Sequence, residues 1–191
     1  NGRDVSNSIA LGQSGNVYVT GQSFGSSTGF DIATVKYNTS GIQQWAARFS
    51  GPGTILDSGR DLEVDPAGNV YVTGHSGAGS GADYITIKYN TNGTQQWTQS
   101  FNGTGNGRDQ ANAIALDGNN NILITGLSLG SGTNNDYATI KYDAAGVQQW
   151  VQRFNGAGND VDEASALAVD SLGSVYVTGK SFSGTDFDYA T

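Results

Sequence analysis

The sequence contains no cysteine and no methionine, and only two prolines and one histidine among its 191 residues. Without cysteine, the chain has no disulfide framework, no thiolate metal ligand and no cysteine nucleophile. No apolar run approaches the roughly 20 residues that a helix needs to cross a bilayer, so we expect no membrane insertion. The chain begins at Asn1 without a signal peptide, and we interpret it as a mature or excised segment.

Positive charge is also scarce. Nine lysines and arginines stand against 17 aspartates and glutamates, which gives a formal net charge of −8. The basic residues are scattered singly, whereas a nucleic acid or an anionic membrane requires a face rich in lysine and arginine. We therefore expect no nucleic-acid partner. Apolar residues still make up 36% of the chain, which indicates a folded core and not a disordered segment.

What the chain has in abundance is repetition. The string "DIATVKYNTSGIQQW" (31–45) returns as "DYITIKYNTNGTQQW" (83–97) and as "DYATIKYDAAGVQQW" (136–150). A glycine that ends a "YVTG"-like run recurs with spacings of 53, 52 and 53 residues at Gly21, Gly74, Gly126 and Gly179. We therefore interpret 1–191 as a single domain, or as a segment of a larger repeat array, with repeat units 1–53, 54–105, 106–158 and an incomplete 159–191.

Each unit contains four runs that are rich in β-branched and aromatic residues. In the third unit they are 112–117, 121–126, 136–143 and 147–154, and Asp, Asn and Gly clusters separate them. The first and third gaps are short enough to force antiparallel hairpins. The sequence therefore predicts an all-β fold, a β-propeller of tandem four-stranded antiparallel blades, with three complete units and a partial fourth. We expect the small first run of each unit to lie nearest the axis.

The segment "DPAGNVYVTG" (65–74), with its echoes "GQSGNVYVTG" (12–21) and "DSLGSVYVTG" (170–179), resembles the bacterial β-propeller repeats known as SBBP. The same hairpin is more loosely similar to NHL repeats, and "KYDAAGVQQW" (141–150) is similar to quinoprotein propeller repeats. The resemblance implies a propeller within a large, secreted or surface-attached bacterial protein. It implies no catalytic residues.

Two aspartates per unit occupy repeating positions on the side of the longer loops. Asp57, Asp109 and Asp162 enter the first run of their units, and the glycine-rich "GTGNGRD" (103–109) offers additional backbone oxygens. Carboxylate and carbonyl oxygens are the ligands that Ca²⁺ prefers, so these three aspartates are candidate calcium ligands. The alternative is that each carboxylate caps loop N–H groups, as in an Asx turn.

The least regular stretch is "SGRDLEVD" (58–65). Because Asp61, Glu63 and Asp65 alternate, a strand places all three on one face. If that strand lines the axis, the three carboxylates form an acidic stripe and a candidate binding site for a cation or a polar ligand. The alternative is a solvated channel wall without a ligand.

The remaining candidates are aromatic and histidine residues. Trp45, Trp97 and Trp150 repeat with the period, and we expect each to wedge between neighbouring blades as a structural residue. His75 is the only histidine and has no evident partner for triad chemistry. The two glutamates stand at non-equivalent places, so the sequence offers no glycosidase pair. We predict no catalytic residue.

These observations favour a non-catalytic, extracellular or cell-surface β-propeller module with a structural or interaction role. One alternative is a self-assembling subunit that completes a ring or a filament through its open blade ends, since three and a half blades leave edges exposed. A second alternative is a carbohydrate-binding module that uses the Gly/Asn-rich loop face. The expected partners are therefore protein, a further copy of the chain, or glycan, and calcium is the only cofactor considered.

Overall fold

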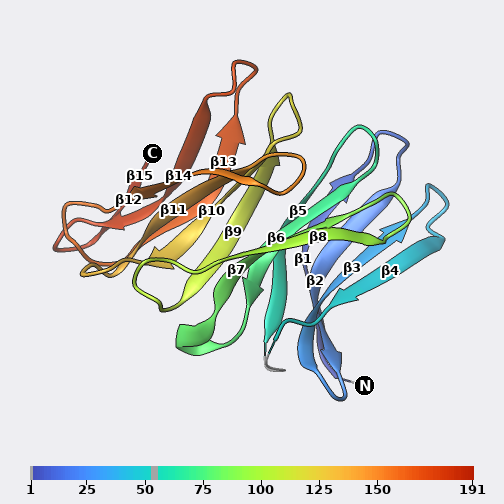
Figure 1. Ribbon diagram of the computed structural model, residues 1–191, viewed down its shortest axis with the longest axis horizontal. Coiled ribbons are helices and arrows are strands. Elements are labelled where there is room, and N and C mark those ends of the chain that lie inside the picture. The colour runs from blue at the N-terminus through green and yellow to red at the C-terminus, as the bar shows by residue number, and fades with distance from the viewer. Residues whose placement is uncertain (1, 53–55) are drawn as a thin grey trace.

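The computed structural model describes residues 2–52 and 56–191, which form four antiparallel sheets side by side (Figure 1). The first sheet consists of β1 (Asp4–Leu11), β2 (Val17–Gly25), β3 (Gly29–Tyr37) and β4 (Gln43–Phe49). The second consists of β5 (Asp57–Val64), β6 (Val70–Ser76), β7 (Asp83–Tyr89) and β8 (Gln95–Phe101). The third consists of β9 (Asp109–Leu116), β10 (Ile122–Leu129), β11 (Asn135–Tyr142) and β12 (Gln148–Phe154). The fourth has three strands, β13 (Asp162–Val169), β14 (Val175–Phe182) and β15 (Phe187–Ala190).

This architecture confirms the all-β class and the repeated antiparallel four-stranded sheet. Within the described residues the single helical segment is one 3₁₀ turn, Gly79–Gly81, and none is long and apolar enough to cross a membrane. The predicted runs of the third unit are all strands. Strand β9 begins earlier than predicted, because Asp109 and Gln110 still pair with Ser128 and Leu127 of β10. The predicted boundary between the first two units, at 53/54, lies outside the described residues.

Glycine and asparagine close the hairpins at positive φ. Gly68 (φ 85°) donates its N–H to the Asp65 carbonyl in the β5–β6 turn. Gly93 (φ 80°) makes the same bond to Asn90 in the β7–β8 turn. In the β9–β10 turn Asn120 (φ 59°) takes the position, since asparagine tolerates the left-handed region better than most residues. These tight turns fix the register of neighbouring strands.

The 53-residue glycine period has a separate cause. At Gly74, an added Cβ would meet the backbone carbonyl oxygen of Ser58 on the neighbouring strand β5. The β5–β6 register shifts between Gly59 and Asp61, so the first strand bulges toward the second at this point. Equivalent contacts occur at Gly21, Gly126 and Gly179. The glycines are therefore needed where two backbones approach closely.

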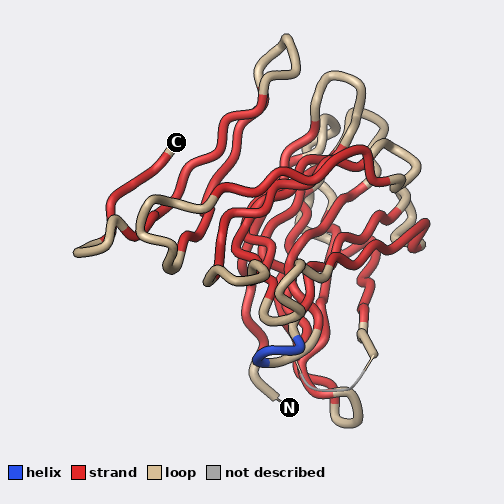
Figure 2. Tube along the Cα trace, turned by 60° about the vertical axis from the view of Figure 1, so that its left-hand side comes forward, coloured by secondary structure: helices blue, strands red, loops and turns tan. Residues whose placement is uncertain are grey.

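The sheets are stacked about their first strands. Strand β1 contacts β5, β5 contacts β9, and β9 contacts β13, which places the first strand of each unit innermost, as predicted. The first and fourth sheets lie at opposite ends of the row in Figure 1, and Figure 2 shows the fourth sheet at the left, beside the C-terminus. The four sheets formed by the described residues therefore do not close a ring, and closure of four blades is not observed.

Two hydrophobic clusters hold the row together. Between the first and second sheets, Tyr18 and Ile32 pack against Leu62, Val72 and Ile87. Between the second and third sheets, equivalent positions repeat the packing, with contributions from Tyr71, Tyr84, Ile114, Ile124 and Ile140. Each internal sheet is therefore buried on both faces: one packs against the preceding sheet and the other against the following sheet.

Candidate functional site

The two ends of the strands carry different connections. The β1–β2 and β3–β4 turns are tight, and their equivalents in later units share one end of the sheets. The second connection of each unit and the links between sheets share the opposite end, which we call the loop face. Binding residues of rigid scaffolds usually lie on such loops, so a binding site is expected on the loop face.

The candidate calcium ligands act as clamps within this loop face. Asp57 Oδ2 accepts a hydrogen bond from the Gly51 N–H (2.7 Å), and its Oδ1 accepts one from the Gly77 N–H (3.2 Å). Asp109 and Asp162 accept the same pair of backbone bonds in the next two units. Each buried carboxylate therefore ties the incoming link to the end of the second strand. This geometry is the loop-capping alternative considered above.

No three His, Cys, Asp or Glu side chains gather into a group that could hold a metal ion anywhere in residues 2–52 and 56–191. Asp57, Asp109 and Asp162 lie on three different sheets, and both oxygens of each already accept amide hydrogens. This geometry gives no support to calcium binding at these residues, which stays a prediction.

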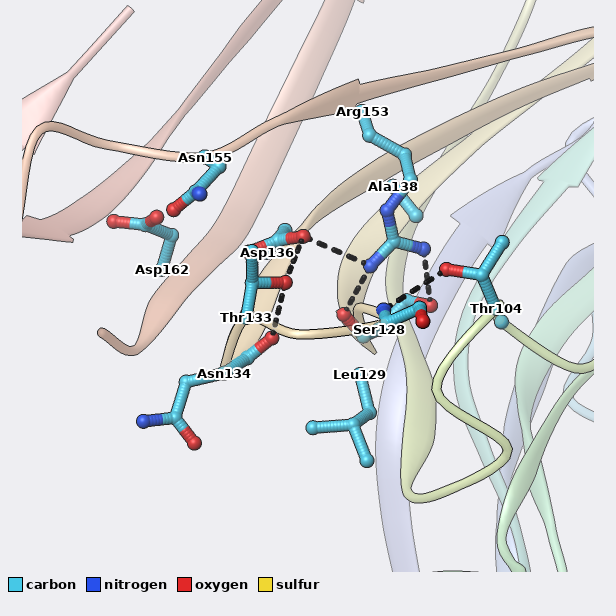
Figure 3. A network of polar contacts seen from close by, with 12 residues as sticks. Thr104, Ser128, Leu129, Thr133, Asn134, Asp136, Ala138, Arg153, Asn155 and Asp162 are labelled. Atoms are coloured by element: carbon cyan, nitrogen blue, oxygen red, sulfur yellow. Dashed lines mark hydrogen bonds and ion pairs between the residues drawn. The ribbon is translucent and has the colours of Figure 1, made fainter. Parts of the chain in front are cut away.

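The second periodic aspartate lies near the start of the third strand of each unit, at Asp31, Asp83 and Asp136, and it forms an ion pair in two of the sheets. Arg153 Nη2 lies 3.1 Å from Asp136 Oδ2 and donates to the carbonyl of Ser128, while Thr133 donates to the same carboxylate oxygen (Figure 3). Arg48 makes the equivalent pair with Asp31 at 2.8 Å. These arginines fasten the outer strand to the ends of the second and third strands.

The second sheet departs from this pattern. Ser100 occupies the position of Arg48 and Arg153, and Asp83 forms no ion pair within the described residues. Burial raises the pKa of Asp83, and the nearby charge of Asp109 raises it further. Arg48 and Arg153 were not among the residues predicted from the sequence, although an arginine three residues after two of the three tryptophans is a readable signal.

Asp61, the first member of the predicted acidic stripe, joins the three inner strands. Its Oδ1 accepts a hydrogen bond from Ser8 Oγ on β1 (2.7 Å), and its Oδ2 accepts one from the Ile114 N–H on β9 (3.1 Å). Glu63 lies close enough to Asp61 for the two carboxylates to interact electrostatically. Burial raises the pKa of Glu63, and the Asp61 carboxylate adds to this rise. The structure therefore brings these two carboxylates together.

Asp65, the third member of the predicted acidic stripe, is held by local hydrogen bonds. It lies beyond the end of β5, in the hairpin turn, where it accepts hydrogen bonds from the Asn69 N–H, the Asn69 side chain and the Tyr71 hydroxyl. Asp65 fixes the turn that follows β5, and ligand binding at Asp61, Glu63 and Asp65 stays a prediction.

Two of the three tryptophans, Trp45 and Trp97, contact the next sheet. Trp45 packs beside Tyr18 of its own sheet and Tyr89 of the next, with ring centroids 6.1 and 6.2 Å apart, and donates from Nε1 to the Thr91 carbonyl (3.0 Å). Trp97 donates in the same way to Ala144 of the third sheet. Trp150 has no equivalent acceptor in the described part of the chain, because the fourth sheet lacks the hairpin that would provide it.

His75 lies at the end of β6 and is 6% exposed. Its Nδ1 atom is buried and has no hydrogen-bond partner among the residues that the structure describes. The pKa of His75 is lowered to about 4, first by burial and then by the charges of Arg60 and Arg108, against the opposing charge of Asp57. Among the residues that the structure describes, no carboxylate hydrogen-bonds to the ring, as the orienting group of a catalytic histidine does.

Comparison with known proteins agrees with this architecture. A solved structure described as a putative gluconolactonase has a TM-score of 0.52 at 16% identity, and covers 96% of this chain and 62% of its own. A eukaryotic initiation factor has a TM-score of 0.51 at 8% identity, over 80% of this chain and 33% of its own. At such low identities, these likenesses concern the fold alone.

Sequence comparison gives two further findings. Residues 44–80 and 149–188 match the family model described as SBBP, Beta-propeller repeat, which confirms the resemblance indicated by the sequence. The regulatory protein FlaEY of Caulobacter vibrioides is 27% identical over 164 residues, which cover 78% of this chain. The chain spans only 16% of the length of that relative.

Proposed function

We propose that this chain of SBBP beta-propeller repeats is a non-catalytic propeller module, extracellular or at the cell surface, that acts through the two free faces of its terminal sheets. The location is supported by the resemblance to repeats of secreted and surface-attached proteins. The absence of catalysis is supported by loop-face carboxylates that are engaged with their own backbone, and by a histidine without a carboxylate partner.

The observation that carries the proposal is the composition of the free face of the first sheet. Ile9 is 68% exposed, whereas Leu62, at the equivalent position of the second sheet, is 3% exposed. Leu11 is exposed beside Ile9 on the same strand. The first sheet therefore presents to solvent the same apolar face that the second sheet buries against its predecessor. Such a face usually marks an interaction surface.

The free face of the fourth sheet is the other half of this interface. Tyr189 is 88% exposed, whereas the equivalent Tyr84 of the second sheet is fully buried against the third. Tyr176 is exposed where Tyr71 is buried. The two terminal faces are thus the two sides of a contact that the chain already makes internally.

The partner that fits both faces is a second copy of the chain. The fourth sheet of one copy then packs on the first sheet of the next, in continuation of the internal stacking. A contact between two different faces is heterologous, and it produces a ring if the rotation closes and a filament if it does not.

Two variants test this contact. A first-face variant carries Ile9→Glu and Leu11→Glu, and a last-face variant carries Tyr176→Glu and Tyr189→Glu. Both change exposed side chains, so the fold should be retained. By sedimentation velocity, the wild type should form oligomers that grow with concentration, and each variant alone should be monomeric. An equal mixture of the two variants retains one matched pair of faces and should form only dimers.

Ile42→Glu is the matched control, because Ile42 is exposed in a hairpin turn and lies outside both faces. It should assemble like the wild type. A wild type that stays monomeric at every concentration, or a mixture that contains no dimer, would contradict the contact. Turnover in a hydrolase panel that is abolished by Asp61→Asn would contradict the non-catalytic part of the proposal.

A further inference from the structure

A cavity of about 230 Å³ opens on the loop face where the first three sheets meet. Its polar walls come from Gln22 of β2, Arg60 of β5, His75 of β6 and Gln110 of β9, with Arg108 just before β9. The cavity is therefore assembled from parts of the chain that are nearly 90 residues apart in sequence.

Two of these residues break the repeat. Arg60 stands where the other units have Asn7, Asn112 and Ser165, and His75 stands where they have Gln22, Leu127 and Lys180. Asn7 and Asn112 donate to the backbone of the next sheet, as an inter-sheet tie requires. Arg60 replaces the asparagine that makes this hydrogen bond in the first and third units, and its side chain lines the cavity. The two departures from the repeat thus meet at one place.

The guanidinium groups of the cavity differ from those elsewhere in the protein. Arg48 and Arg153 are paired with aspartates, whereas neither Arg60 nor Arg108 forms an ion pair within the described residues. Arg108 donates to the amide oxygen of Gln110 (2.7 Å), and Arg60 Nε is buried without an acceptor. Two uncompensated positive charges therefore face one cavity of a chain whose net charge is −8.

His75 gives an independent indication of a ligand. The side chain is more than nine-tenths buried, it lines the cavity, and its Nδ1 has no partner in the part of the chain that the structure describes. Buried polar atoms normally have a protein, solvent or ligand partner. The charged groups that act on the ring are Arg60, Arg108 and the opposing Asp57, and both oxygens of Asp57 are held by backbone amides.

We propose that this cavity binds the oxyanion group of a small ligand, a carboxylate or a sulfate, between Arg60 and Arg108, with hydrogen bonds from Gln110 and His75. Guanidinium groups are suited to such anions because their planar N–H donors match two oxygens at once. The volume equals that of roughly seven water molecules, which holds the anionic group and a few further atoms and is below the usual size of a site for a drug-sized ligand.

The single histidine makes the site directly observable. The ring resonances of His75 are followed by NMR at pH 7 while sodium sulfate, sodium acetate or sodium glucuronate replaces sodium chloride at constant ionic strength. At least one of the three anions should produce a saturable shift, and the saturated site should show a raised pKa of His75, because the bound anion offsets the two guanidinium charges. Comparison of the sulfate and acetate titrations shows whether the site prefers a sulfate or a carboxylate. The glucuronate titration tests a carboxylate on a sugar ring.

Variants separate a built site from a general charge effect. Arg108→Gln changes an exposed side chain and should weaken binding roughly 10- to 100-fold, which is the loss expected for a charge-assisted hydrogen bond. Arg60→Gln should do the same. Arg3→Gln is the matched control, because Arg3 precedes Asp4 as Arg108 precedes Asp109, is exposed, and does not line the cavity.

The proposal is overturned if all three anions give only linear shifts, if Arg108→Gln binds as tightly as the wild type, or if Arg3→Gln weakens binding as much as Arg108→Gln. Because Arg108 is exposed, its substitution keeps the test open even if the Arg60 variant fails to fold. The titration is carried out in the first-face variant, whose substitutions at Ile9 and Leu11 lie outside the cavity and remove the proposed contact between copies. The two proposals therefore succeed or fail separately.

Discussion

The internal and terminal sheets use the same residue types at the same positions and bury them to different extents. Val70 and Val72 of the second sheet are fully buried, whereas their equivalents Val17 and Val19 in the first sheet are only half-buried. The residues are identical, and the difference comes from the sheet that packs on one and not on the other. The burial of a side chain in this fold therefore depends on whether another sheet packs on it as much as on the residue type.

This comparison explains why the chain is repetitive. A single twisted sheet with apolar residues on both faces cannot bury them alone, and stacking equivalent sheets solves the problem in a regular way. The internal sheets have neighbours on both sides. The terminal sheets have one neighbour each, and their free faces remain apolar. Four comparisons between equivalent positions test this view.

The largest difference should appear between Leu62→Ala and Ile9→Ala. Leu62 is buried between two sheets, so the substitution should leave a cavity and lower the free energy of unfolding by about 2–5 kcal/mol. Ile9 is exposed at the equivalent position, so its substitution should change that free energy by less than about 0.5 kcal/mol. Urea denaturation of the two variants measures both values. Equal losses of unfolding free energy in the two variants would mean that the free face of the first sheet is already buried against another surface.

The second comparison concerns pH and uses His75→Gln, which introduces the residue found at the equivalent Gln22. The folded-state pKa of His75 is lowered from 6.5 to about 4, so the unfolded chain binds the proton first as the pH falls. Stability from the neutral imidazole is complete above pH 6.5 and is lost toward pH 4. Between pH 7 and pH 5 the wild type should lose about 2 kcal/mol more than His75→Gln.

Denaturation in amine buffers with chloride as the only added anion measures this difference without a ligand for the cavity. Identical pH dependence in the two proteins would show that the imidazole is not held in an environment that disfavours its charge.

The third comparison isolates the contact of a tryptophan with the next sheet. Gly41 and Gly93 both have positive φ, so alanine should be strained at either position by about 1 kcal/mol. A Cβ at Gly93 would lie 2.7 Å from the Trp45 ring, whereas a Cβ at Gly41 meets nothing within 4 Å. We therefore expect Gly93→Ala to cost a further 1–2 kcal/mol, roughly, as overpacking does. Equal melting temperatures of the two variants would contradict the wedge role of Trp45.

The smallest effect should come from Ser100→Arg, which introduces into the second sheet the arginine that the first and third sheets possess. Arg48 and Arg153 pair with Asp31 and Asp136, and Asp83 occupies the equivalent position in the second sheet. The new pair should add less than about 1 kcal/mol, because the arginine side chain would be partly exposed. It should also lower the raised pKa of Asp83, which carboxyl NMR would follow. A gain equal to that of Gln99→Arg, its neighbour, would exclude a specific pair.

The repeat itself could be predicted from the sequence to a large extent. The alternation of β-branched residues with Asp, Asn and Gly clusters predicts four strands per unit, and the short gaps predict their antiparallel pairing. The glycine period predicts equivalent structure without explaining it. The close approach of Ser58 to Gly74 became evident only when both strands were in place.

The candidate sites were less predictable because they depend on contacts between units. Alternation predicted a shared face for Asp61, Glu63 and Asp65, but it could not indicate that Asp61 joins three strands or that Asp65 is held by the following turn. The periodic aspartates were recognised, but the sequence left their role open between a metal and a cap. The grouping of Arg60, His75 and Arg108 required three sheets to meet, which no local pattern can indicate.

By itself, the sequence determined the strands, the turns and the repeated unit, because these depend on interactions between residues close together in the chain. Only the tertiary structure decided which copies of the same residue are buried, which carboxylates are occupied by backbone amides, and which positive charges are left without a partner. The reason is physical: burial and electrostatic pairing depend on what lies across an interface, and in this protein each interface joins positions about 50 residues apart.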